Sequence, residues 1–184
     1  MRTLQLPYSA KARIWIGDLP RAGYPARDTL RRTYAALGSA NGTKAVGAVE
    51  VIRAVGRPSS YGLLGGELVL DASSDFRVTV HTAMPHGSSY ADTIAAGPEH
   101  VRVGLLEEYA EGVFEGVELA KNHVSFDFAG ELTVNRAAHS DVESSQIMFK
   151  HLSLVLMKML CMQEQSPSGD DLLDLFWDKF GEFD

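Results

Sequence analysis

Histidines and carboxylates gather in two stretches of the sequence where they could do chemistry. In the first, His81 and His86 flank Pro85, and Asp92 and His100 follow. Imidazole and carboxylate groups bind zinc or iron, but this spacing matches no standard motif, so we predict neither a metal site nor a cofactor. Polar loops often carry function, so this stretch is an alternative small-molecule pocket. Its candidate residues lie on or beside the connection from Met84 to His100 and are His81, His86, Tyr90 and His100.

The second stretch joins the residue types of a hydrolase triad in His139, Ser140 and Asp141, followed by Ser144 and Ser145. Triads are normally assembled from distant loops, and the sequence has no Gly-x-Ser-x-Gly elbow. Serines before an apolar helix are typical N-caps, and His139 would then lie in an exposed polar turn. We therefore expect a binding protein and leave an enzyme as the alternative.

Hydrophobic periodicity predicts the elements that position these residues. Two pairs of strands are expected to form hairpins, one around the turn at 72–75 and one around 129–130. The predicted strands are Ala12–Ile16, Ala45–Val55, Glu67–Asp71, Phe76–Thr82, Val101–Val103, Val124–Phe128 and Leu132–Asn135.

Three helices are predicted in the body of the chain. Leu30, Tyr34 and Leu37 share a helical face, which predicts a helix from Asp28 to Gly38. A second is expected at about 107–121, where Gly112 and Gly116 would allow close approach of a neighbouring element. A third follows Ser144 or Ser145 and carries a wide apolar stripe from Met148 to Leu160.

The end of the chain differs from the body. Residues 1–163 are predicted to form one domain, and 164–184 a polar linker followed by an acidic, aromatic helix. The apolar face of such a helix can bind in an apolar groove, which would belong to the same chain, to a second copy or to another protein. A protein partner or a homodimer is therefore expected. The docking residues would be Leu172, Phe176, Trp177 and Phe180.

Composition narrows the class of protein. Of 184 residues, 45% are hydrophobic and 22% charged, as in globular proteins. A formal net charge of -7 disfavours broad nucleic-acid binding. The single cysteine, Cys161, cannot form an internal disulfide. Without an apolar segment long enough for a signal peptide or a membrane span, the chain is expected to be cytoplasmic, with no membrane partner.

Three pieces, in order, resemble domain IV of bacterial elongation factor G. Glu107-Glu108-Tyr109 is similar to the family's helix opening, and Leu132–Asn135 matches its strand in type. The most specific piece is Asp141-Val142-Glu143-Ser144-Ser145, followed by Phe149-Lys150 at the family's spacing. The resemblance covers roughly residues 56–163. It departs where Arg136-Ala137-Ala138 replaces the family's Asp-Gly turn before the histidine and where Ala110-Glu111 replaces Ile-Pro.

The resemblance implies an α+β fold like the second domain of ribosomal protein S5, with a mixed sheet and helices packed on one face. The C-terminal amphipathic helix would be added to it. The resemblance also implies a non-catalytic role, in which Arg136, His139 and Asp141 would contact the ribosome. No Gly-x-x-x-x-Gly-Lys-Ser/Thr motif is present, so no GTPase accompanies the domain. The superfamily also includes enzymes, which keeps the small-molecule alternative open.

Overall fold

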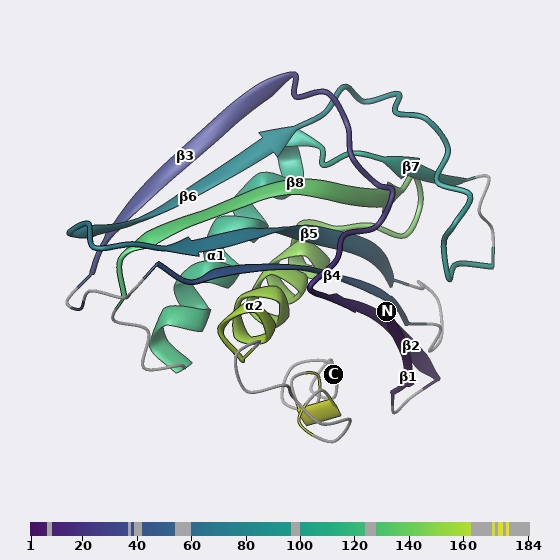
Figure 1. Ribbon diagram of the computed structural model, residues 1–184. Coiled ribbons are helices and arrows are strands. Elements are labelled where there is room, and N and C mark those ends of the chain that lie inside the picture. Colours follow the sequence, from purple (N-terminus) through teal and green to yellow (C-terminus); the bar gives the residue numbers. More distant parts are fainter. Residues whose placement is uncertain are drawn as a thin grey trace.

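One mixed sheet of eight strands carries two helices on one of its faces (Figure 1). The computed structural model describes residues 1–6, 9–36, 38, 42–53, 60–96, 100–123, 128–162, 171, 173–174 and 176. The elements are β1 (Arg2–Gln5), β2 (Ala10–Ile16), β3 (Asp28–Ala35), β4 (Lys44–Arg53), β5 (Ser60–Leu70), β6 (Asp75–Thr82), β7 (Val101–Val103), α1 (Glu107–His123), β8 (Gly130–Ser140) and α2 (Gln146–Met162). This confirms the predicted α+β class.

The strand β8 is an interior strand of the sheet and pairs with three others. The order is β1-β2-β4-β5-β8-β6-β3, and β7 pairs with the end of β8. Most neighbours are antiparallel, but β6 and β8 run parallel and are connected through β7 and α1. Leu132 faces Leu68 of β5 on one edge and Val78 of β6 on the other. Both hydrogen-bonding edges of β8 are therefore occupied along residues 130–134.

This topology contradicts the hairpin predicted around 72–75. The strands β5 and β6 follow each other in sequence, yet β8 lies between them, because a turn signal fixes a reversal of the chain and not the pairing across it. The second predicted hairpin would pair 124–128 with 132–135, and residues 124–127 lie outside the described residues. The start of β8 pairs with β5 and β6.

The predicted helix at 28–38 is also wrong, because Asp28–Ala35 forms the edge strand β3 and pairs antiparallel with β6. A spacing of four places Leu30 and Tyr34 on one face of a strand as well as of a helix. Arg32 lies between them on that face and masks the strand period. Its guanidinium carbon lies 4.5 Å from the centre of the Phe114 ring, and Nη2 pairs with Glu111 of α1, so a charged residue occupies the face that turns toward the helix.

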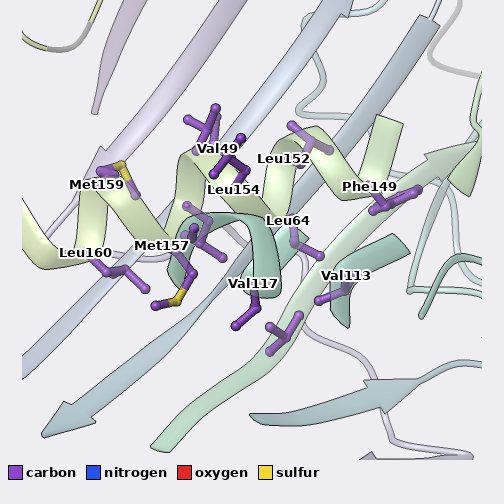
Figure 2. Packing of buried hydrophobic residues seen from close by; sticks show 14 of the residues in the cluster. Val49, Leu64, Val113, Val117, Phe149, Leu152, Leu154, Met157, Met159 and Leu160 are labelled. Carbon is purple, nitrogen blue, oxygen red and sulfur yellow. The ribbon is translucent and has the colours of Figure 1, made fainter. Parts of the chain in front are cut away.

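The main core lies between the sheet and the two helices. Figure 2 shows Val49 and Leu64 of the sheet near Leu152 and Leu154 of α2, with Val113 and Val117 of α1 beside them. The predicted helices at 107–121 and after Ser145 are confirmed. The hydroxyl of Ser145 accepts a hydrogen bond from the Met148 amide at 3.2 Å, which is an N-cap contact.

The helices α1 and α2 approach each other closely at two glycines. A Cβ added to Gly112 would overlap the carbonyl oxygen of Gln146, and one added to Gly116 would overlap that of Lys150. The hydroxyl of Ser153 donates to the Val113 carbonyl across this interface at 2.8 Å. The glycines thus have the packing role that the sequence predicted.

Irregular segments cover part of the opposite face. Along β4 and β5, Ala48 and Leu63 belong to a second apolar cluster, whereas their neighbours Val49 and Leu64 belong to the main core. Because successive side chains of a strand point to opposite faces, the second cluster lies on the side away from the helices. The segment 17–27 contributes Ala22 to it, and the connection after β6 contributes Tyr90.

A buried ion pair anchors the connection after β6 to this face. Glu50 is 0% exposed, and its Oε2 lies 2.7 Å from Nη2 of Arg13, its partner across β2 and β4. Its Oε1 accepts from the Tyr61 hydroxyl and from the Thr93 hydroxyl, both at 2.8 Å. The amide of Ile94 adds a third hydrogen bond to Oε1 at 3.1 Å. Every oxygen of the buried carboxylate is therefore satisfied.

The tail contributes to the core of its own chain. Phe176 is 2% exposed within the main core, and Leu173 packs against that core. Leu172, Trp177 and Phe180 lie outside the described residues, so their docking role stays a prediction. Within the described residues, no helix combines the length and apolar character needed to cross a bilayer.

Candidate ligand pocket

A pocket of about 530 Å³ opens where the end of β8 meets the start of α1. Its walls come from four parts of the chain that are distant in sequence. The connection after β6 contributes residues 85–87, and β7 contributes Arg102. The first turn of α1 and the residue before it contribute Leu106, Glu108 and Tyr109, and β8 with its following turn contributes His139 and Asp141.

Strand pairing and two glycines bring these parts together. In the β7–β8 register, Arg102 faces His139. The chain then turns at Gly104, whose φ of +123° favours glycine and where a Cβ would overlap the side chain of Ala83. Gly87 likewise packs against the Val103 carbonyl with no space for a side chain. These close approaches bring α1 and the connection after β6 against the same end of β8.

His139 is the buried polar group of the pocket. The residue is 1% exposed, and Nδ1 of its ring lies 2.9 Å from the carbonyl oxygen of Gly104. A carbonyl only accepts, so Nδ1 carries the hydrogen and neutral His139 keeps a lone pair on Nε2. The expected exposed turn is therefore wrong, because pairing with β7 extends β8 through this residue.

The charges of the pocket are predominantly acidic. Nε of Arg102 donates to Oδ2 of Asp141 at 3.2 Å, which neutralises one carboxylate. Glu108 lies in the first turn of α1. Burial, the charge of Glu108, a hydrogen bond to Glu108 and the charge of Asp141 together raise the pKa of the Tyr109 hydroxyl to about 12, with burial as the largest cause. Both carboxylates therefore act on the same part of the pocket.

The serines near His139 bond to the backbone. The Ser140 hydroxyl accepts from the amides of Val142 and Glu143 at 3.3 and 3.2 Å. The Ser144 hydroxyl donates to the Tyr61 carbonyl at 2.8 Å and accepts from the Ser140 amide at 2.8 Å. The predicted N-cap role is met by Ser145, whereas Ser140 and Ser144 hold the turn between β8 and α2. None of these contacts joins a serine to His139.

The two predicted groups of site residues are partly united in this pocket. His86 comes from the first group, and His139 and Asp141 come from the second. Arg136 belongs elsewhere, since its guanidinium packs against Gly23 and Nη1 donates to the Asn135 carbonyl at 2.9 Å.

The other candidates of the first group also lie apart from the pocket. His81 is half-buried in β6, and its carbonyl accepts from the Tyr24 hydroxyl at 2.8 Å. Tyr90 is buried in the second cluster on the far face of the sheet. His100 is exposed, and its carbonyl accepts from the Asp141 amide at 2.9 Å. Of the four residues predicted for the alternative pocket, His86 alone lines this one.

Arg102, Leu106, Glu108 and Tyr109 complete the pocket and were not predicted as site residues. The only signal for them was the acidic opening of α1, because their proximity to His139 depends on the pairing of β7 with β8. The part of the chain that the structure describes contains no group of three His, Cys, Asp or Glu side chains arranged to hold a metal ion. Comparison of the chain with protein-family models, curated proteins and solved structures finds no match.

Proposed function

We propose that this protein binds a small polar molecule in the pocket between β8 and α1. The observation that carries the proposal is the imidazole of His139, which lines the pocket and is held through Nδ1 by the Gly104 carbonyl at 2.9 Å. This contact fixes the ring, and a ligand that enters the pocket can bond to the other ring nitrogen, Nε2. The volume of about 530 Å³ lies within the range of small-molecule sites.

Binding is favoured over hydrolysis because the nearby serines have other roles. The hydroxyls of Ser140 and Ser144 are engaged with backbone groups, so neither is paired with an imidazole that could activate it.

The relation to elongation factor G domain IV remains a proposal about the fold. Its support is the position of both helices on one face of a mixed sheet, together with the pieces of sequence that carry the resemblance. A ribosome contact would need His139 at the surface, but this side chain is buried, and Arg136 lies outside the pocket. A small ligand that enters the pocket can reach His139, whereas a large RNA surface cannot.

The test uses ligand-observed NMR with the full chain and a library of small amines, acids, alcohols and sugars. His86 is exposed at the pocket wall, so His86→Trp should obstruct the pocket without disturbing the core. Met84→Trp is the matched control, because Met84 is exposed on the same connection but does not line the pocket. Compounds that bind the natural chain should be lost with His86→Trp and retained with Met84→Trp. The proposal fails if no compound binds or if binding survives His86→Trp.

A further inference from the structure

The pocket offers an unusual set of hydrogen-bond acceptors. The carboxylates of Glu108 and Asp141 accept only, and neutral His139 adds the Nε2 lone pair. With Arg102 counted as positive and the histidines as neutral, these side chains carry a formal charge of about -1. Arg102 already donates to Asp141, so its charge is partly engaged before any ligand arrives.

We infer that the pocket takes the primary ammonium group of a small organic cation, an inference that rests on the pocket being a ligand site. An ammonium group has three donors and no acceptor, which complements the two carboxylates and the imidazole lone pair. The cation would also neutralise the carboxylate that Arg102 leaves uncompensated.

The electrostatics near Tyr109 support a cation over an anion. The charges of Glu108 and Asp141 both contribute to the raised pKa of this phenol, so both carboxylates act at its hydroxyl. A carboxylate or phosphate ligand would face the same two charges and the His139 lone pair. Arg102 could still donate to an anion through its Nη groups, but its contact with Asp141 through Nε already offsets part of its charge. An ammonium group instead gains from both carboxylates.

The test is an NMR titration of the full chain with butylamine, which is protonated at neutral pH, with butyrate and butanol as controls of the same length. Butylamine should shift the amide signals of residues 104–109 and 139–141, whereas butyrate and butanol should not. Glu108→Gln should weaken butylamine binding about tenfold or more, because it removes a charged hydrogen-bond partner. Glu107→Gln is the matched control, since it removes the same charge from the same helical turn without touching the pocket.

Different outcomes separate the two proposals. If butyrate shifts the pocket signals and butylamine does not, the ammonium inference is overturned while a ligand pocket stands. Equal weakening by Glu108→Gln and Glu107→Gln would also overturn it, because binding would then reflect only the overall negative charge. If none of the three probes binds, the ammonium inference fails. The compound library with His86→Trp then decides the pocket function separately.

Discussion

The two faces of the sheet are covered in different ways. One face packs against α1 and α2 through a continuous apolar core, which includes Val49, Leu64 and Leu152. The other face holds a smaller apolar cluster under irregular segments, and a buried charge lies beside it at Glu50. Regular elements satisfy their own backbone and need only an apolar stripe to dock. An irregular segment has unpaired backbone groups, so it needs polar partners on the sheet.

Glu50 provides those partners. It pairs with Arg13 beneath the segment and accepts hydrogen bonds from the Thr93 side chain and the Ile94 amide within it. Arg13 also binds Asp92, with Nη1 2.9 Å from Oδ1. Residues 92–94 of the connection after β6 are thus held by directed contacts. The part nearer His86 is held by backbone hydrogen bonds of Ser88 and Tyr90 with β7.

The largest expected effect is that of Glu50→Ala on the stability of the fold. The substitution leaves Arg13 as a buried charge without its main partner, and removes the acceptor of three other donors. Breaking a buried pair from one side costs about 3–5 kcal/mol. Urea unfolding followed by circular dichroism should show a loss of that size. Hydrogen exchange should accelerate at the Ile94 amide more than at the amides of α2.

Glu67→Ala is the control for this comparison. Glu67 lies on β5 and pairs with Lys44 at 2.8 Å, but the two side chains are 35% and 61% exposed. An exposed pair of this kind contributes less than about 1 kcal/mol. Equal losses for the two variants, or uniform acceleration of exchange across both faces, would contradict the anchoring role of Glu50.

An intermediate effect is expected on the helical face from Gly116→Ala. Alanine gains about 1 kcal/mol of helix propensity over glycine, so an isolated helix would become more stable. Here the added methyl group would overlap the Lys150 carbonyl, and α1 and α2 would have to separate. We expect a net loss of about 1–3 kcal/mol in thermal or urea unfolding. The exposed Glu118→Ala in the same helix should change stability by less than about 0.5 kcal/mol. A stabilised Gly116→Ala variant would show that the contact is not tight.

The helical face could be predicted from sequence to a large extent, and the pairing of the strands could not. The apolar stripe of α2 and the glycines of α1 are local patterns, and both have the predicted role. By contrast, β8 lies between β5 and β6, an insertion that depends on contacts between residues far apart in the chain. The edge strand β3 was mistaken for a helix because a spacing of four suits both periods.

The site was predicted by residue type and not by arrangement. His86, His139 and Asp141 were singled out as chemically capable residues, and all three line the pocket. The sequence does not show that these three side chains meet in one pocket, because this requires β7 to pair with β8 and the chain to reverse at Gly104. Tyr90 was chosen from the same polar connection as His86 but is buried on the far face of the sheet. Sequence proximity within an irregular segment therefore says little about which site a side chain joins.

The smallest expected effect is a pH-dependent contribution at the rim of the helical face. Glu115 of α1 lies 2.8 Å from Lys150 of α2, and that hydrogen bond is the main cause that lowers its pKa below the ordinary value of 4.5. A carboxyl group with a lowered pKa stabilises the fold above its ordinary pKa, and this contribution is lost as the pH falls through the folded value.

Glu115→Gln should therefore cost less than about 1 kcal/mol at neutral pH, and the difference from the natural chain should vanish in strong acid. Urea unfolding at both pH values measures this, with Glu118→Gln as the control for removing a charge from an exposed position of α1. A difference that persists unchanged in acid would mean that Glu115 acts through packing, and the rim would then resemble the apolar interface beneath it.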